Sequence, residues 1–139
     1  MLKTIPAILT PELLKIMMEM GHGDELVIGD GNFPAASCGK RLVRLDGHGV
    51  EPVLDAVLTF FPLDYAVDAP VAVMDNRSTE EPPIWARYRA VIQKHEGDKH
   101  IESMERFAFY ERSRSAYAIV ATGEAAVFAN IILKKGVVR

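Results

Sequence analysis

The sequence predicts an α/β fold in which helices pack against a mixed β-sheet in a single layered domain, residues 1–139. Three observations lead to this prediction. Short apolar runs of strand length alternate with segments whose apolar residues recur at helical spacing. The chain has 139 residues, of which 49% are hydrophobic, so one domain can bury a core. No repeat, low-complexity segment or shift in composition marks a domain boundary.

The first expected element is a helix that begins at Pro11, a residue suited to the first helical position, with Thr10 as its N-cap. Its apolar stripe consists of Leu13, Leu14, Met17 and Met18. Gly21 is expected to stop it. Residues 25–29 (ELVIG) are then typical of a short buried strand, and residues 31–40 have the composition of a loop.

The rest of the chain continues the alternation. The expected strands cover residues 41–45, 70–75, 117–122 and 127–133, and the expected helices cover residues 50–61, 84–95 and 103–116. Prolines border two of these helices, because Pro62 ends one and Pro82 and Pro83 open the next. A short turn, GEAA, separates the last two strands, which predicts that they pair as a hairpin.

Composition excludes several classes of function. The net charge is -3 and the basic residues are scattered, so no nucleic-acid partner is expected. No apolar run approaches the roughly 20 residues needed to cross a bilayer, so no membrane association is expected. The single cysteine, Cys38, forms no disulfide within the chain and is typical of a reducing compartment. The predicted location is the cytoplasm.

The stretch GHGDELVIGDGNFP, residues 21–34, carries the first candidate residues. His22 lies between two glycines, and an imidazole gives and takes protons near neutral pH. Flanking glycines let a substrate approach closely. The alternative is a surface histidine just past a helix end, where a cation is favoured in any case. From the histidine alone, this plainer alternative is favoured.

Asp30 follows the expected strand 25–29 and is the second candidate. A carboxylate at a strand end of an α/β domain is a common ligand-binding position, and a turn aspartate that caps the loop backbone is an equal alternative. A five-residue strand spans roughly 16 Å. His22 and Asp30 therefore serve one site only if the chain bends at Gly29 or if two subunits build the site.

Two further segments carry candidate residues. RFAFYER, residues 106–112, offers Arg106 and Tyr110 among aromatic residues, and its alternative is an amphipathic helix with the arginines in water. Asn130 falls within an expected apolar strand, where a buried amide needs a ligand or a backbone partner. Cys38 is the only cysteine and no pair of histidines has zinc spacing, so no metal site is predicted. The sequence also contains no phosphate-binding loop and no GxSxG elbow.

Taken together, the motifs GHGDE, RFAFYER and NIILKKGV, with the lengths between them, resemble the fucose mutarotase and ribose pyranase family over essentially the whole chain. The likeness is closest to the fucose branch. It implies a ribose pyranase-like fold and an isomerase that interconverts sugar anomers without a cofactor. It further implies L-fucose as the first substrate, ahead of D-ribose and related pyranoses. It also implies a homo-oligomeric ring, typically a decamer, with active sites near subunit contacts.

The resemblance also implies roles for single residues. His22 matches the catalytic acid/base, and Asp30, Arg106 and Asn130 match sugar-binding positions. Ala129 and Phe128 complete the predicted substrate-binding segment, although relatives commonly carry a tyrosine where this chain has Phe128. Tyr110 and Tyr117 are the candidates for replacing that missing hydroxyl.

Three other interpretations stay open. A non-catalytic sugar-binding module linked to uptake or regulation is supported by Phe128, which lacks the phenol. A hydrolase or lyase that uses His22 with the two carboxylates would be favoured by a tightly held divalent metal, for which the ligand set is poor. A purely structural ring protein leaves His22 and Asn130 unexplained.

Overall fold

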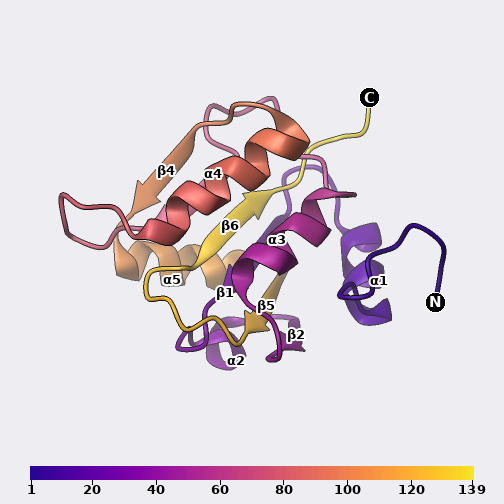
Figure 1. Cartoon of the computed structure of the whole chain (residues 1–139), viewed down its shortest axis with the longest axis horizontal. Coiled ribbons are helices and arrows are strands. Elements are labelled where there is room, and N and C mark those ends of the chain that lie inside the picture. The colour runs from indigo at the N-terminus through magenta and orange to yellow at the C-terminus, as the bar shows by residue number, and fades with distance from the viewer.

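The computed structural model describes residues 1–139 and contains five helices and six strands (Figure 1). The helices are α1 (Pro11–Glu19), α2 (Ala35–Cys38), α3 (Val50–Leu58), α4 (Pro83–Glu96) and α5 (Arg106–Ser115). The strands are β1 (Glu25–Gly29), β2 (Leu42–Leu45), β3 (Val71–Met74), β4 (Ile101–Met104), β5 (Ala118–Thr122) and β6 (Ile131–Lys134). The predicted α/β class is confirmed.

All six strands join one mixed sheet in the order β2-β5-β1-β6-β3-β4. Only β6 runs against its neighbours, and the other five strands share one direction. Five strands therefore end at one edge of the sheet, here called the carboxyl edge, where β6 begins. The opposite edge, where those five strands start and β6 ends, is called the amino edge.

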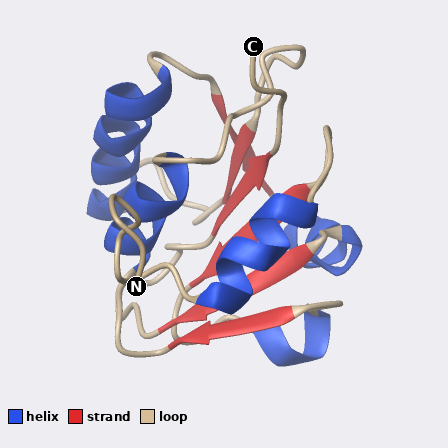
Figure 2. Cartoon of the chain, turned by 90° about the vertical axis from the view of Figure 1, so that its right-hand side faces the viewer, coloured by secondary structure: helices blue, strands red, loops and turns tan.

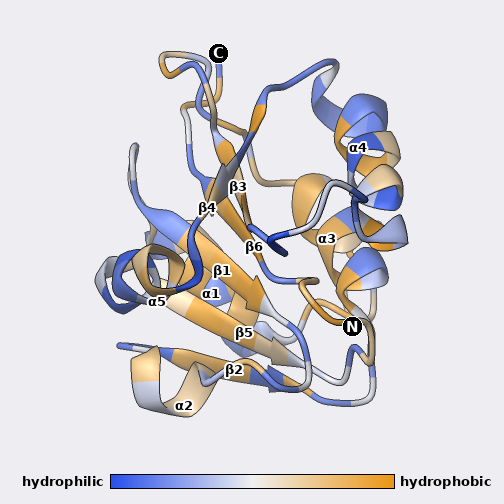
Figure 3. Ribbon diagram, turned by 90° about the vertical axis from the view of Figure 1, so that its left-hand side faces the viewer, coloured by the Kyte–Doolittle hydropathy of each residue, from blue (hydrophilic) through white to orange (hydrophobic).

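Helices cover both faces of the sheet, so the domain has three layers (Figure 2, Figure 3). On one face, α1, α3 and α4 bury a core cluster that includes Leu54, Tyr88 and Ile28. On the other face, α2 and α5 bury a smaller cluster around Phe109, Val27 and Ile132. The central strands are apolar on both sides because both faces are covered. None of the helices combines the length and the apolar composition that spanning a bilayer requires.

The predicted hairpin between the last two strands is wrong. β5 and β6 do not pair, because β1 lies between them and forms hydrogen bonds with both. The segment 123–130 is consequently a connection that crosses the end of β1, and β6 starts only at Ile131. A turn signal fixes where a chain reverses, whereas the central place of β1 is decided by long-range pairing.

Three other boundaries differ from the prediction. The segment expected to be a helix from residue 103 begins as the edge strand β4, and α5 starts at Arg106 after its N-cap Glu105. β4 carries little apolar signal because its residues are only partly buried. The expected loop 31–40 contains the short helix α2. The expected helix 50–61 ends at Leu58.

Candidate functional site

His22 lies on the turn between α1 and β1, at the amino edge of the sheet. Gly23 adopts a φ of 89°, a left-handed conformation that favours glycine, so the backbone itself requires one of the two flanking glycines. The N–H of Gly23 donates to the carbonyl of Lys135 at 2.8 Å, and the N–H of Lys135 donates to the carbonyl of Asp24 at 2.8 Å. The His22 turn is therefore tied to the end of β6.

Asp64 is the partner of His22. Its Oδ1 lies 3.1 Å from Nε2 of the imidazole. The side chain of Asp64 is 4% exposed, whereas that of His22 is 51% exposed. The backbone N–H of Ala66 lowers the pKa of Asp64, and the hydrogen bond with His22 adds to this effect. An ionised, buried carboxylate thus holds one side of a ring whose other side is open.

At the carboxyl edge, Asp30 and Asn130 join the end of β1 to the start of β6. The N–H of Asp30 donates to Oδ1 of Asn130 at 2.7 Å, and the N–H of Ala129 donates to Oδ2 of Asp30 at 3.4 Å. Oδ1 of Asp30 accepts from the N–H of Asn32 at 3.0 Å. Asp30 therefore caps the loop backbone and, at the same time, anchors the segment that holds Asn130.

Burial dominates the electrostatics of Asp30, which is 6% exposed. Burial raises the pKa of this carboxyl, while the N–H groups of Asn32 and Ala129 lower it and the nearby charge of Glu124 raises it further. A carboxyl of this kind accepts hydrogen bonds when ionised and takes up a proton more readily than an exposed one.

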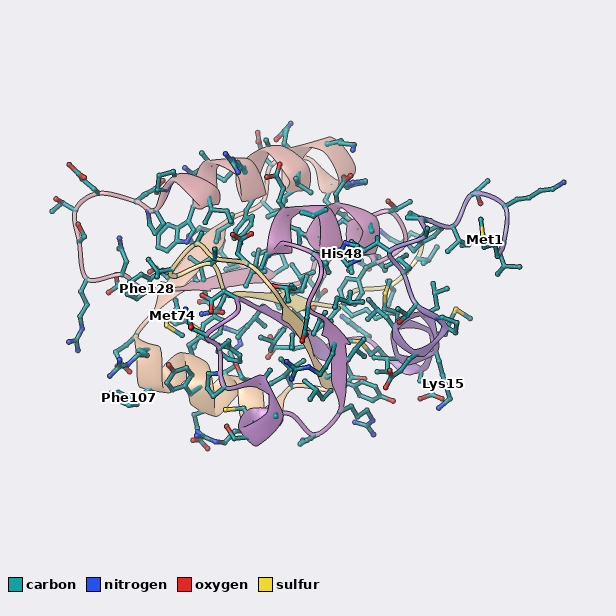
Figure 4. All side chains as sticks on the ribbon, turned by 60° about the horizontal axis from the view of Figure 1, so that its bottom comes forward. Met1, Lys15, His48, Met74, Phe107 and Phe128 are labelled. Atoms are coloured by element: carbon teal, nitrogen blue, oxygen red, sulfur yellow. The ribbon has the colours of Figure 1, made fainter.

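Phe128 stands in a left-handed conformation with a φ of 54°, which is uncommon for a residue with a side chain. Two aromatic side chains of α4 hold this backbone in place. Nε1–H of Trp85 donates to the carbonyl of Phe128 at 2.8 Å, and the hydroxyl of Tyr88 donates to the carbonyl of Ala129 at 2.6 Å. The Phe128 side chain packs against the smaller core cluster, which includes Met74 at the end of β3 (Figure 4).

The helix α5 brings Arg106 and Tyr110 to the same edge. Glu105 caps the helix, since its carboxylate accepts from the N–H groups of Phe107 and Ala108 at 2.9 and 3.0 Å. Arg106 and Tyr110 are four residues apart and so share a helix face. Tyr110 packs against Phe33, with ring centroids 5.7 Å apart.

Two hollows open at the carboxyl edge, and each includes only part of this set. One, of about 280 Å³, is lined by Asp30, Phe33 and neighbours. The other, of about 610 Å³, is lined by Phe128, Glu124 and residues of the loop before α4. Arg106 and Tyr110 line neither hollow. In a single chain Arg106 is exposed and Tyr110 and Phe128 are half-buried, whereas Asp30 and Asn130 are buried beneath them.

The structure thus gathers six of the eight predicted site residues at the carboxyl edge and leaves two at the amino edge. The six are Asp30, Arg106, Tyr110, Phe128, Ala129 and Asn130. Tyr117 precedes β5 at the amino edge, and its hydroxyl donates to Glu19 at 3.2 Å, so it does not supply a hydroxyl beside Phe128 in the same chain. His22 is the other residue at the amino edge, with β1 between it and Asp30.

Sequence reasoning missed Asp64, Trp85 and Tyr88. Asp64 is 42 residues from His22, and no local pattern pairs them. The two aromatic residues belong to the apolar stripe of α4, and only their long-range hydrogen bonds distinguish them from core residues. Asn130 was expected inside a strand, but it lies one residue before β6, where its side chain is free to meet Asp30.

Comparison with known proteins relates the whole chain to one family. Residues 3–138 match the model of the RbsD / FucU transport protein family. The chain is 45% identical to human fucose mutarotase, with 98% of this chain and 94% of the relative covered. It is 48% identical to L-fucose mutarotase from Actinobacillus pleuropneumoniae serotype 5b, with 99% and 97% covered.

The fold comparison agrees with the sequence comparison. A crystal structure of fucose mutarotase from Streptococcus pneumoniae, in complex with L-fucose, superposes with a TM-score of 0.95. The two chains are 51% identical, and 99% of this chain and 100% of that chain are covered.

Proposed function

This chain belongs to the RbsD / FucU transport protein family, and on that premise we propose that it is a mutarotase that interconverts the α and β anomers of L-fucose. The observation that carries the proposal is the match, over nearly its whole length, to a fucose mutarotase in complex with L-fucose. The geometry adds an exposed imidazole held by a buried carboxylate and, at the other edge, a set of polar and aromatic groups around a strand end.

Anomer interconversion requires only proton transfer by a correctly positioned group. A proton leaves the anomeric hydroxyl, the ring opens to the aldehyde, the carbonyl turns over and the ring closes. His22 is the acid/base group, since positioned acid/base groups typically accelerate such steps by about 10²–10⁴-fold. No cofactor is needed for this chemistry.

The sugar is held by the carboxyl edge in this proposal. Asp30, Arg106 and Asn130 bind hydroxyl groups, and the backbone at Ala129 contributes to the same surface. Phe128 stacks on the C–H side of the sugar, and Tyr110, on the Arg106 face of α5, is the candidate phenol at this edge. Because Asp30 and Asn130 are already joined to each other, they present one fixed surface.

We further propose that each active site uses two subunits of a homo-oligomeric ring, expected to be a decamer. Within one chain, His22 lies at the amino edge and the sugar-binding set at the carboxyl edge, roughly 16 Å of strand apart. Exposed apolar side chains lie close in sequence to both regions. Tyr65 and Val67 follow Asp64, and Val137 and Val138 follow β6. Phe107 and Val127 adjoin the sugar-binding residues. Such surfaces are suited to contacts between copies of the chain.

The proposed location is the cytoplasm, a reducing compartment that suits a chain whose single thiol, Cys38, is buried and unpaired.

Saturation-difference NMR on L-fucose tests the proposed function, because it measures anomer exchange at equilibrium. The wild-type protein is expected to accelerate exchange, and His22→Ala to lose about 10²-fold of that acceleration or more. His100→Ala is the matched control, because His100 is an exposed histidine paired with Asp68 and has no assigned role. Binding of L-fucose without acceleration would replace the mutarotase with the sugar-binding module.

A further inference from the structure

The pair of His22 and Asp64 at the amino edge carries an inference about the atom that moves the proton. Resting on the proposed function, we propose that Asp64 is the positioning residue of His22, and that it makes Nδ1 the nitrogen that exchanges a proton with the sugar. Asp64 itself does not contact the sugar.

The direction of the hydrogen bond between His22 and Asp64 determines the tautomer of the imidazole. Asp64 is buried and its pKa is lowered, so at neutral pH it is an ionised carboxylate that only accepts hydrogen bonds. Nε2 of His22, 3.1 Å from Oδ1, must therefore carry a hydrogen. A neutral imidazole has one N–H, so the lone pair falls on Nδ1, which makes no hydrogen bond within the chain.

The surroundings hold this geometry. The N–H of Asp64 donates to the carbonyl of Lys134 at 3.0 Å, and the N–H of Ala66 donates to Oδ1 of Asp64 at 3.0 Å. A Cβ at Gly136 would lie 2.8 Å from the Cα of Asp64, so the two backbones are in close contact there. The turn of His22 is tied to the same end of β6 through Gly23. Both His22 and Asp64 are thus held by hydrogen bonds to the end of β6.

One nitrogen suffices for the chemistry. Nδ1 takes the proton of the anomeric hydroxyl, and the electron pair of that O–H bond forms the C=O bond of the aldehyde. The bond between C1 and the ring oxygen breaks, and its electron pair goes to the ring oxygen. The ring oxygen then receives the same proton from Nδ1. Both oxygens are attached to C1, so a single nitrogen reaches them in turn, and the hydrogen on Nε2 stays with Asp64 throughout.

The carboxylate also stabilises the intermediate imidazolium. Two other charged groups surround the pair. Asp24 lies on the same turn, where its Oδ2 accepts from the N–H of Gly21 at 2.7 Å. Lys134, at the end of β6, acts on Asp64 and lowers its pKa. Of these charged groups, Asp64 is the one that contacts the ring.

Long-range ¹H–¹⁵N NMR of the histidine rings reads the ring form directly and needs no substrate. At about pH 8, where an ordinary imidazole is neutral, wild-type His22 is expected to show a protonated Nε2 and an unprotonated Nδ1. Asp64→Ala removes the acceptor, so both forms are expected to appear. Asp64→Asn keeps an oxygen that accepts from Ala66 and Nε2, so the wild-type form is expected to persist.

Kinetics then separate positioning from charge. Asp64→Ala is expected to lower kcat by about tenfold or more with KM for L-fucose little changed, and Asp64→Asn is expected to restore most of kcat. Asp68→Ala, which breaks the exposed pair with His100, is the matched control and is expected to change neither kcat nor KM.

The outcomes distinguish this proposal from the proposed function. A wild-type His22 that carries its hydrogen on Nδ1 overturns the inference even if the protein is an active mutarotase. An unchanged kcat in folded Asp64→Ala also overturns it. A wild-type protein with the expected ring form but no anomer exchange would instead contradict the proposed function, while the ring assignment would stand.

Discussion

The backbone N–H of Asp30 donates to the side-chain oxygen of Asn130 at 2.7 Å, across 100 residues of chain. Asp30 in turn accepts from the N–H of Ala129, so the end of β1 and the start of β6 hold each other. Both residues are buried, at 6% and 4% exposure. The proposed sugar-binding surface is therefore part of the structural support of the central strands.

Replacing Asn130 is expected to cost stability as well as sugar binding. Asn130→Ala leaves the buried N–H of Asp30 without a partner, which should lower the free energy of unfolding by about 1–3 kcal/mol. Urea unfolding measures this change. Asn76→Ala is the control, because the amide of Asn76 bonds only at the surface, and it should change stability by less than about 0.5 kcal/mol. Equal values for the two variants would show that the bond to Asp30 contributes nothing.

Restoring a phenol at position 128 is expected to raise the rate. Phe128→Tyr adds a hydroxyl at the rim of a hollow, where it can donate a hydrogen bond to the sugar, and one such bond is worth about tenfold in kcat. Steady-state anomer exchange measures the effect. Phe60→Tyr adds the same group at an exposed position just after the C-terminal end of α3 and should have no effect. No gain in Phe128→Tyr would mean that another group already fills this role.

Tyr88 is expected to support the sugar-binding segment from beneath. Tyr88→Phe leaves the buried carbonyl of Ala129 without its donor, and the left-handed backbone at Phe128 loses one of its two supports. We expect a loss of about 1–3 kcal/mol in unfolding free energy and a higher KM with kcat less affected. Trp85→Phe removes the other support and should act in the same direction. If KM stays at the wild-type value in both variants, α4 does not position this segment.

Asp64 is expected to shape the loss of stability in acid. Its pKa in the folded protein is lowered from the ordinary value of 3.8, chiefly by the N–H of Ala66. The folded state therefore binds this proton less readily than the unfolded state. The resulting stability is present above pH 3.8 and is lost as the pH falls through the lower folded value.

Urea midpoints measured from about pH 6 down to about pH 3 test this dependence. Asp64→Asn cannot ionise, so its stability should fall less steeply over the acid part of that range than the wild-type stability does. Parallel curves for the two proteins would show that Asp64 contributes no linkage between folding and pH.

Local signals in the sequence predicted much of the fold. The Thr10 cap is present and its oxygen accepts from the N–H of Leu13 at 3.2 Å, and strand 25–29 has the predicted bounds. The failures concern pairing over long distances. The turn GEAA predicted a hairpin, but β1 lies between β5 and β6 in the sheet. β4, an edge strand with little apolar surface to bury, left no pattern to find.

For the candidate site, too, local motifs were visible in the sequence and long-range contacts were not. His22, Asp30 and Asn130 were predicted as site residues because each lies in a motif made of residues close in sequence. Asp64 was not, because its role depends on a contact between two loops that meet only at the end of β6. The caution that His22 and Asp30 lie at opposite ends of a strand follows from strand geometry alone, and the structure places them in that way.

A complementation experiment tests most directly the central claim, a mutarotase site shared between two subunits. His22→Ala lacks the proton carrier and Arg106→Ala lacks part of the sugar-binding set, so each homo-oligomer is expected to be inactive in L-fucose anomer exchange. Random mixed oligomers made by co-expression combine an intact His22 with an intact carboxyl edge at about one quarter of the sites. Recovery of about one quarter of wild-type activity is therefore predicted. Mixed oligomers as inactive as the separate variants would contradict the shared site.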